Sequence, residues 1–169
     1  LGDVYKRQGH NTDGIGFVEA LADLGFASKE KNILIIGAGG AARSIAFSLI
    51  QETPAKIIIA NRDKSRAISL ATSLASATHT AVIPTDFTEV TLNEWIPKSD
   101  LVVNATSIGM HPYDDISPVP AILIQPNIFV YDLVYNPIET VFVQRAKTQG
   151  AVAAGGLSML CLLYTSDAA

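Results

Sequence analysis

The chain contains little cysteine, little charge and no long apolar run. Its only cysteine among 169 residues is Cys161, so it has no internal disulfide and fits a reducing compartment such as the cytoplasm. Charged residues make up 17% of the chain, the net charge is −4, and no basic stripe suggests nucleic acid as a partner. The apolar stretch 151–164 is too short to span a bilayer. We therefore expect a cytoplasmic globular protein without nucleic-acid or membrane partners.

Residues for metal binding or nucleophilic catalysis are equally scarce. The three histidines, His10, His79 and His111, have no ligand-like spacing and no cysteine pair beside them, so no metal site is predicted. Ser107 has no motif-level base near it, which argues against nucleophilic catalysis. Neither metal chemistry nor nucleophilic catalysis is therefore predicted.

The most informative segment present is an apolar run that leads into a glycine-rich turn. Residues 33–36, Ile-Leu-Ile-Ile, have the length of a buried parallel strand, and Gly37-Ala38-Gly39-Gly40-Ala41-Ala42 opens an alanine-rich helix. Gly37 allows a tight turn, Gly39 lets backbone N–H groups approach a pyrophosphate, and Ala42 permits close packing of helix on strand. This order predicts the phosphate-binding first half of a dinucleotide fold, with the pyrophosphate at the positive end of the helix.

The end of the next strand, residues 56–60, indicates which dinucleotide is bound. NAD-specific members of this fold carry Asp or Glu there, whereas this chain has Asn61 and Arg62, followed by Lys64 and Arg66. A guanidinium suits a 2′-phosphate, and cations at a helix start oppose the helix dipole unless an anion binds, so we favour NADP. One alternative is that these cations only form a solvated helix start. Another is that Asp63 caps the helix or contacts the free 2′-hydroxyl of NAD.

Strands and helices alternate along the chain, which predicts an α/β fold: a Rossmann-like, doubly wound parallel sheet with helices on both faces. The expected strands are 33–36, 56–60, 81–84, 100–106, 129–135 and 151–153. The expected helices are Thr12 or Asp13 to about Leu24, 40–52, 64–76, a turn at 92–96 that buries Trp95, 137–149 with Pro137 in its first turn, and 157–163. Polar residues after the fourth and fifth strands, 104–107 and 132–136, are expected to line a cleft at the carboxyl edge.

Six segments in chain order, spread over residues 9–160, resemble shikimate dehydrogenase. They are Asn11-Thr12-Asp13-Gly14, Gly37-Ala38-Gly39-Gly40-Ala41, Asn61-Arg62 with Arg66, Asn104-Ala105-Thr106-Ser107 with Gly109-Met110, Tyr131-Asp132-Leu133-Val134-Tyr135-Asn136-Pro137, and Gly156-Leu157 with Met159-Leu160. The resemblance implies NADP-dependent interconversion of 3-dehydroshikimate and shikimate, a step of chorismate and aromatic amino acid biosynthesis.

The resemblance also implies a role for particular residues. Asp13 matches the family's catalytic, substrate-binding Asp, although from the residues alone it could be only a helix N-cap. Tyr135 matches a substrate-contacting Tyr, the alternative being simple packing, and Gly156 could equally be a helix-start glycine. The implied cofactor-binding residues are Gly37, Ala38, Gly39, Gly40, Ala41, Asn61, Arg62, Arg66, Thr106, Leu133 and Gly156.

Two departures from the family pattern limit this expectation. The family's amino-terminal substrate domain, with its catalytic Lys, has no counterpart in the sequence; Leu163 stands where the family has a Gln, and Ser158 where it has a Gly. We expect 1–8 and 164–169 to be uncertain or non-native ends, 9–28 a linking helix that carries Asp13, 29–155 the NADP domain and 156–163 the start of a closing helix.

Three functions are therefore weighed. The leading hypothesis is a fragment of an NADP-dependent shikimate dehydrogenase, acting on a small molecule as a monomer or homodimer and inactive alone. A quinate/shikimate enzyme that uses NAD is the closest alternative, which Asp63 keeps open. The third hypothesis is a non-catalytic dinucleotide-binding module, for which the missing Lys argues.

Overall fold

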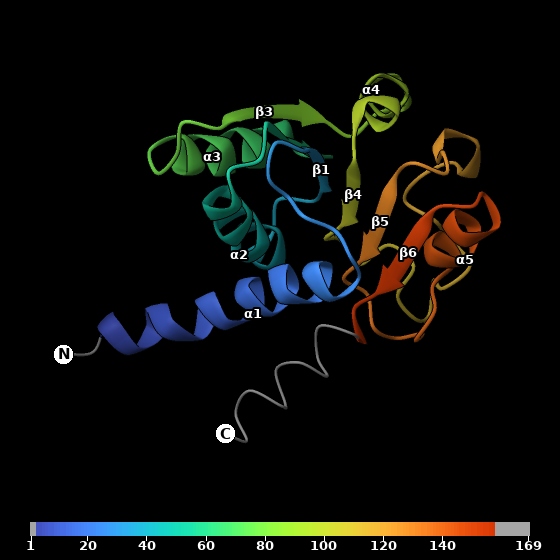
Figure 1. Ribbon diagram of the computed structural model, residues 1–169, viewed down its shortest axis with the longest axis horizontal. Coiled ribbons are helices and arrows are strands. Elements are labelled where there is room, and N and C mark those ends of the chain that lie inside the picture. The colour runs from blue at the N-terminus through green and yellow to red at the C-terminus, as the bar shows by residue number, and fades with distance from the viewer. Residues whose placement is uncertain (1–2, 158–169) are drawn as a thin grey trace.

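A parallel sheet of six strands forms the centre of the molecule (Figure 1). The computed structural model describes residues 3–157, with side chains from Asp13 onward. The strand order is β3-β2-β1-β4-β5-β6, and every neighbouring pair is parallel. The strands are β1 (Asn32–Ile36), β2 (Lys56–Asn61), β3 (Ala81–Asp86), β4 (Leu101–Asn104), β5 (Phe129–Asp132) and β6 (Val152–Gly155). This is the doubly wound Rossmann order, so the predicted fold class is confirmed.

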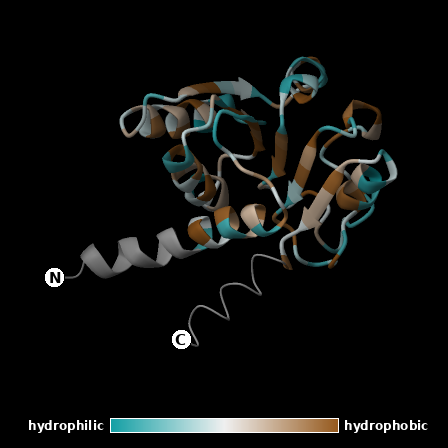
Figure 2. Cartoon of the chain, viewed as in Figure 1, coloured by the Kyte–Doolittle hydropathy of each residue, from teal (hydrophilic) through white to brown (hydrophobic). Residues whose placement is uncertain are grey.

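Helices cover both faces of this sheet. On one face lie α1 (Asp3–Asp23), α2 (Gly40–Leu49) and α3 (Lys64–Ala75), and on the other α4 (Glu89–Trp95) and α5 (Val141–Thr148). Short 3₁₀ turns, η1 (Ile50–Glu52), η2 (Ile96–Lys98) and η3 (Ala121–Leu123), complete the connections. Figure 2 shows the apolar strands at the centre and polar residues on the outer helix surfaces and loops.

The strands divide their side chains between two apolar cores. In β1, Ile33 and Ile35 pack into the core under α1–α3, whereas Leu34 and Ile36 pack into the core under α4 and α5. All four are at most 1% exposed. Because successive side chains of a strand point to opposite faces, a continuous apolar run is what a strand covered on both faces requires.

Helix α1 crosses α2 at a glycine. A Cβ at Gly14 would overlap the Ser48 hydroxyl and lie 2.6 Å from the Ser44 carbonyl oxygen, so the two helices meet almost backbone to backbone. One turn further along α1, the Phe17 ring packs edge-on against Tyr131 of β5, with 4.9 Å between ring centroids. These contacts fix α1 against both the second helix and the fifth strand.

Several predicted boundaries were wrong. Helix α1 does not begin at Thr12 or Asp13 but at Asp3, so Asp13 is inside the helix and is not an N-cap. The helix predicted from Pro137 begins at Val141, where the Thr140 hydroxyl accepts a hydrogen bond from the Val143 N–H group.

Other differences concern burial and length. Trp95 is only half-buried: it packs against the core under α4 and α5, and the ammonium groups of Lys56 and Lys98 lie 5.6 and 5.1 Å from its ring centroid. The fourth and fifth strands end earlier than predicted, at Asn104 and Asp132. The closing helix 157–163, with Ser158, Cys161 and Leu163, and the end 164–169 fall outside the described residues apart from Leu157.

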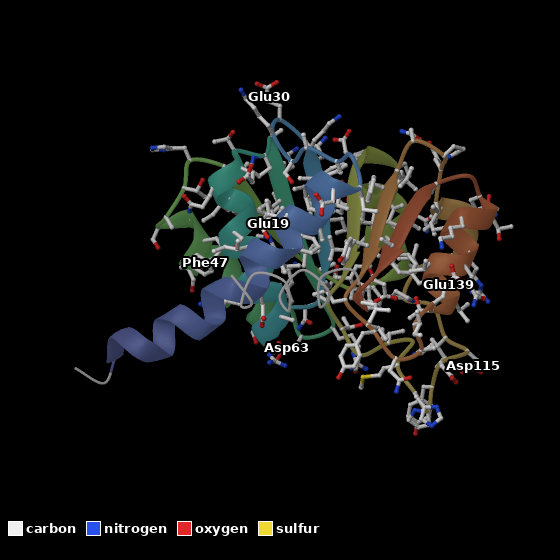
Figure 3. All side chains as sticks on the ribbon, turned by 60° about the horizontal axis from the view of Figure 1, so that its bottom comes forward. Glu19, Glu30, Phe47, Asp63, Asp115 and Glu139 are labelled. Atoms are coloured by element: carbon white, nitrogen blue, oxygen red, sulfur yellow. The ribbon has the colours of Figure 1, made fainter. Side chains whose placement is uncertain are left out.

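The loops that follow the strands share one edge of the molecule. Figure 3 shows Asp63, which follows β2, and Asp115, which follows β4, at one edge and Glu30, which precedes β1, at the opposite one. Within residues 3–157, no helix is long and apolar enough to cross a membrane. The same described residues contain no cluster of three or more His, Cys, Asp or Glu side chains that would hold a metal ion.

Candidate functional site

The turn after β1 is built on a glycine that no other residue replaces without strain. Gly37 has a φ of +114°, and its N–H group donates to the Ala60 carbonyl oxygen at 2.8 Å. A Cβ there would lie 2.8 Å from the carbonyl oxygen of Ala105, which follows β4. Both the positive φ and the close approach require glycine, and they bring the ends of β1, β2 and β4 together.

The amino end of α2 differs from those of the helices that follow it. Asp63, Thr88 and Thr140 each cap their helix by accepting a hydrogen bond from a backbone N–H group of α3, α4 and α5. Gly39, at the start of α2, supplies no side chain, and a Cβ built on Gly39 or Gly40 meets nothing within 4 Å. The first N–H groups of α2 therefore face open space with the positive end of the helix dipole, an arrangement that binds anions.

The turn after β2 presents cations. The Asn61 amide donates to the Asp63 carbonyl oxygen at 2.9 Å, and the Asp63 carboxylate accepts from the Ser65 N–H group at 3.0 Å and the Ser65 hydroxyl at 2.5 Å. The two hydrogen bonds from Ser65, of which that from its hydroxyl has the larger effect, lower the pKa of the Asp63 carboxyl group. Arg62 and Arg66 are exposed, and no carboxylate of the described residues forms an ion pair with either. Both guanidinium groups are thus free to bind an anionic ligand.

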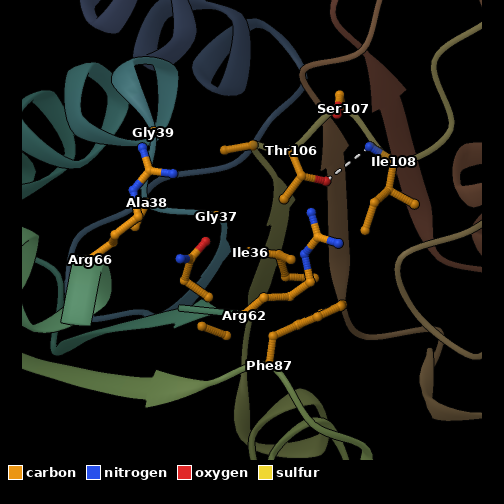
Figure 4. A pocket seen from close by; sticks show the side chains of 13 residues that line it. Ile36, Gly37, Ala38, Gly39, Arg62, Arg66, Phe87, Thr106, Ser107 and Ile108 are labelled. Atoms are coloured by element: carbon orange, nitrogen blue, oxygen red, sulfur yellow. Dashed lines mark hydrogen bonds between the residues drawn. The ribbon is translucent and has the colours of Figure 1, made fainter. Parts of the chain in front are cut away.

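These two turns line a single cavity of about 290 Å³ (Figure 4). In Figure 4 the Arg66 side chain extends toward Ala38 and Gly39, and the Arg62 side chain toward Thr106 and Ile108. The lining residues are Ile36, Gly37, Ala38, Gly39, Ala60, Asn61, Arg62, Arg66, Phe87, Ala105, Thr106, Ser107 and Ile108. The cavity therefore combines an anion-binding helix end with two unpaired guanidinium groups.

A second cavity of about 290 Å³ adjoins the first between α2 and α3. It is lined by Gly40, Arg43 and Arg66 among others, so Gly40 lines this second cavity and not the first. Ala41 is exposed in the first turn of α2, directly after this lining.

Of the polar residues expected at the ends of β4 and β5, Thr106 and Ser107 line the first cavity, whereas Asn104 and Asp132 do not. Asn104, Asp132 and Thr140 are all 0% exposed, and Asp132 is bonded to both of the others. The Asp132 carboxylate accepts from the Asn104 amide at 2.9 Å, the Val134 N–H group at 3.0 Å and the Thr140 hydroxyl at 2.6 Å. Burial raises the pKa of Asp132, against the opposing effect of these hydrogen bonds. This cluster holds the loops rather than contacting solvent.

The remaining predicted site residues line neither of these two cavities. The N–H group of Gly156 donates to the Val134 carbonyl oxygen at 3.2 Å, and a Cβ on Gly156 would overlap the Leu133 carbonyl oxygen. Tyr135 is 57% exposed in the same loop. Asp13 is exposed on α1, one helical turn before the contact of Phe17 with Tyr131. Among the described residues, Leu133 and Gly156 are brought together, whereas Asp13 and Tyr135 form no hydrogen bond with each other.

The sequence interpretation missed several lining residues, among them Phe87, Ile108 and Arg43. Phe87 and Ile108 line the first cavity and Arg43 the second. An aromatic residue directly after the third strand was the available signal for Phe87, and the arginine in the first turn of the glycine-led helix was the signal for Arg43. Ile108 carried no signal of its own.

Comparison with known proteins identifies the family. The family model described as shikimate/quinate 5-dehydrogenase matches residues 20–113, more than half of the chain. The chain belongs to this family.

Individual relatives agree with this assignment. Shikimate dehydrogenase (NADP(+)) of Moorella thermoacetica is 41% identical over 162 residues, which are 96% of this chain and 54% of the relative. A crystal structure of Listeria monocytogenes shikimate 5-dehydrogenase with shikimate and NAD aligns with a TM-score of 0.85 at 30% identity, over 90% of this chain and 54% of that one. A shikimate dehydrogenase structure in complex with NADP+ aligns with a TM-score of 0.80 at 38% identity, over 90% and 53%. The chain thus spans about half the length of the shikimate dehydrogenases that it matches.

Proposed function

We propose that this chain is the NADP-binding part of a shikimate dehydrogenase, which interconverts 3-dehydroshikimate and shikimate. One observation carries the proposal: the uncapped amino end of α2 and the unpaired Arg62 and Arg66 line the same cavity. The family and the names of the relatives, shikimate dehydrogenase (NADP(+)), support the same reading.

The cofactor's phosphate groups are assigned to two places. The pyrophosphate binds the backbone N–H groups at Gly39, Gly40 and Ala41, where a Cβ at either glycine position would meet only open space. The 2′-phosphate binds the guanidinium groups of Arg62 and Arg66, which suit its oxygens in geometry and charge. Gly37 and Ala38 shape the turn, and Asn61 holds the backbone of the loop that carries Arg62.

The other end of the cofactor is assigned to the loops after β4, β5 and β6. Thr106, Leu133 and Gly156 are proposed to line the nicotinamide, which when bound accepts or supplies the hydride. The Tyr135 hydroxyl is proposed to donate a hydrogen bond to the substrate. Asp13 is proposed to bond a substrate hydroxyl and to take part in the accompanying proton transfer. The exposure of both side chains leaves them accessible to substrate.

The decisive experiment measures NADP and NAD binding to the Arg62→Ala variant by calorimetry. NADP should bind more weakly by about 1.5–3 kcal/mol, the contribution of a hydrogen bond to a charged group, while NAD affinity stays unchanged. Lys64→Ala is the matched control, because Lys64 is an exposed cation at the same helix start that does not line the cavity. Unchanged NADP affinity in Arg62→Ala would refute the 2′-phosphate assignment.

An NAD-using quinate/shikimate enzyme is the second candidate, favoured by the NAD present in the Listeria relative. The engagement of Asp63 as the helix cap of α3 supports NADP instead, because its carboxylate already accepts two hydrogen bonds from Ser65. Turnover of shikimate and quinate by the natural full-length protein with each cofactor separates the two. Binding of NADP without turnover of either substrate would support the non-catalytic module.

The domain boundaries, the location and the partners are part of the same proposal. They are a linking segment at 9–28 that contains most of α1, an NADP domain at 29–155, a closing helix that starts at 156, a cytoplasmic location, and a monomer or homodimer that binds neither nucleic acid nor membrane. Light scattering of the purified protein at several concentrations measures the oligomeric state.

A further inference from the structure

One buried carboxylate, that of Asp132, ties together the loops after β4 and β5. Its Oδ1 atom accepts from the Asn104 amide at 2.9 Å and from the Val134 N–H group at 3.0 Å, and its Oδ2 atom accepts from the Thr140 hydroxyl at 2.6 Å. Asp132, Asn104 and Thr140 are fully buried. The carboxylate therefore joins the end of β4, 28 positions away in sequence, to two points of the loop that follows β5.

The first branch of the junction leads to Thr106. Since a carboxylate only accepts, the Asn104 amide has to turn its NH₂ group toward Asp132 and its oxygen toward the loop. That oxygen accepts from the Thr106 N–H group at 3.1 Å and the Thr106 hydroxyl at 2.7 Å. The Thr106 hydroxyl in turn accepts from the Ile108 N–H group at 3.1 Å. The Asn104 NH₂ group also donates to the Ile108 carbonyl oxygen at 3.0 Å, so Asn104 links Asp132 at two points to a loop that lines the cofactor cavity.

The second branch leads to Leu133 and Tyr135. The Val134 N–H group, between these two residues, is bound to Asp132, and the Val134 carbonyl oxygen accepts from the Gly156 N–H group at 3.2 Å. Thr140 closes the same loop and also caps α5 by accepting from the Val143 N–H group at 3.3 Å. Both ends of the loop 133–140 are therefore fixed by one side chain.

The partners of Asp132 are all neutral donors. In the part of the chain that the structure describes, no Lys, Arg or His side chain forms an ion pair with it. Each of these hydrogen bonds has a preferred distance and angle between donor and acceptor. A carboxylate held this way defines the relative position of its three partners.

We propose that Asp132 is a positioning residue that holds Thr106 and the segment 133–135 in register for the nicotinamide half of the cofactor. The inference rests on the proposed function, because it takes NADP as the ligand. It assigns to Asp132 no contact with cofactor or substrate.

The test compares two ligands in the Asp132→Asn variant of the natural full-length protein. NADP reaches both ends of the site, whereas adenosine 2′,5′-bisphosphate carries the 2′-phosphate but no nicotinamide. The Kd of NADP should rise about tenfold, a factor that corresponds to one buried hydrogen bond, while the Kd of the bisphosphate stays within about twofold. A general loss of structure would weaken both ligands equally, so the ratio of the two Kd values reports positioning.

Asp86→Asn is the matched control. Asp86 also ends a strand and accepts a threonine hydroxyl, that of Thr91, at 2.6 Å, but it is only half-buried and the bond stays within the β3–α4 connection. Asp86→Asn should change the Kd of neither NADP nor the bisphosphate. Equal effects of Asp132→Asn on both ligands, or none on either, would overturn the positioning role.

A second pair of variants applies if Asp132→Asn does not fold. Thr140→Val removes the hydroxyl bonded to Asp132, and Thr140→Ser keeps it. Thr140→Val should raise the Kd of NADP but not that of the bisphosphate, and Thr140→Ser should raise neither. Identical Kd values for the two variants would overturn the proposal. If the unaltered protein binds neither NADP nor the bisphosphate, the proposed function itself fails, which is a different result.

Discussion

The two halves of the sheet use their carboxyl edges in opposite ways. After β1 and β2 the edge is open: an uncapped helix end faces Arg62 and Arg66 across a cavity. After β4 and β5 the edge is filled: Asn104 and Asp132 are buried and bond to each other. The first half leaves its helix end and its arginines available to a ligand, whereas the strand-end residues Asn104 and Asp132 of the second half are bonded within the protein. The difference teaches that a polar residue at the end of a strand indicates a binding site only when it has no hydrogen-bond partner within the protein.

The carboxylates follow the same division. Hydrogen bonds from the Ser65 hydroxyl and the Thr91 hydroxyl lower the pKa of Asp63 and of Asp86, both on the open half. Burial raises the pKa of Asp132 on the filled half. Exposure to water lets the hydrogen bonds dominate in the first case, whereas desolvation dominates in the second.

The largest expected effect comes from breaking the seam between the halves, where Gly37 touches Ala105. Gly37→Ala forces a side chain to a φ of +114° and places its Cβ 2.8 Å from the Ala105 carbonyl oxygen. The free energy of unfolding should fall by about 2–4 kcal/mol, as strain and overlap add. Urea denaturation measures it, and an unchanged midpoint would contradict the role assigned to this turn.

Gly39→Ala sharpens the contrast within the open half. Gly39 has a negative φ of −85° and its Cβ meets nothing within 4 Å, so the free energy of unfolding should stay the same or rise slightly. NADP should nevertheless bind more weakly, by about 1–2 kcal/mol, because the methyl group enters the space assigned to the pyrophosphate. Calorimetry and thermal unfolding on one sample separate these effects; equal NADP affinity would place the phosphates elsewhere.

The filled half should show its own pH dependence. A raised pKa means that native Asp132 keeps a proton that the unfolded chain has released, so its contribution to stability is fully present below its ordinary pKa. That contribution is lost as the pH rises through the raised native pKa. Asp132→Asn should remove this part of the pH dependence, which thermal unfolding between pH 3 and 8 measures. An identical slope in both proteins would argue against a buried titrating carboxyl group.

The smallest effect is expected at Asp63, and with the opposite sign. Its lowered pKa stabilises the folded chain above the ordinary pKa, and this contribution is lost as the pH falls through the lowered value. Asp63→Ala should therefore lower the melting temperature slightly at neutral pH and hardly at all in strong acid. A larger loss in acid than at neutral pH would reverse this assignment.

Much of the open half was predictable from the sequence, because its determinants are local. The run 33–36, the glycines that follow it and the pair Asn61-Arg62 each act within a few residues of their position. The structure places Gly37, Arg62 and Arg66 around one cavity, as the pattern indicates. Their roles toward NADP remain predictions until binding is measured.

The filled half was less predictable, because its determinants are not local. Asn104 meets Asp132 across 28 positions of sequence, so nothing beside either residue shows that both are buried. The start of α5 was misjudged for a related reason: Pro137 looks like a first-turn residue, but the hydroxyl of Thr140 is what caps the helix. Trp95 was expected to be buried, yet it is only half-buried and faces two lysines, one of which comes from β2, 39 positions earlier.

For a protein engineer, the crossing at Gly14 divides helix α1 into a constant position and variable ones. Any larger residue at position 14 pushes α1 away from the backbone of α2 and shifts the neighbouring Asp13 with it. Ile15 and Glu19, by contrast, are exposed on the same helix. Those two positions line a cavity of about 590 Å³ with Phe47 and Ser48 of α2, so a mutant library that varies them should retain glycine at the crossing.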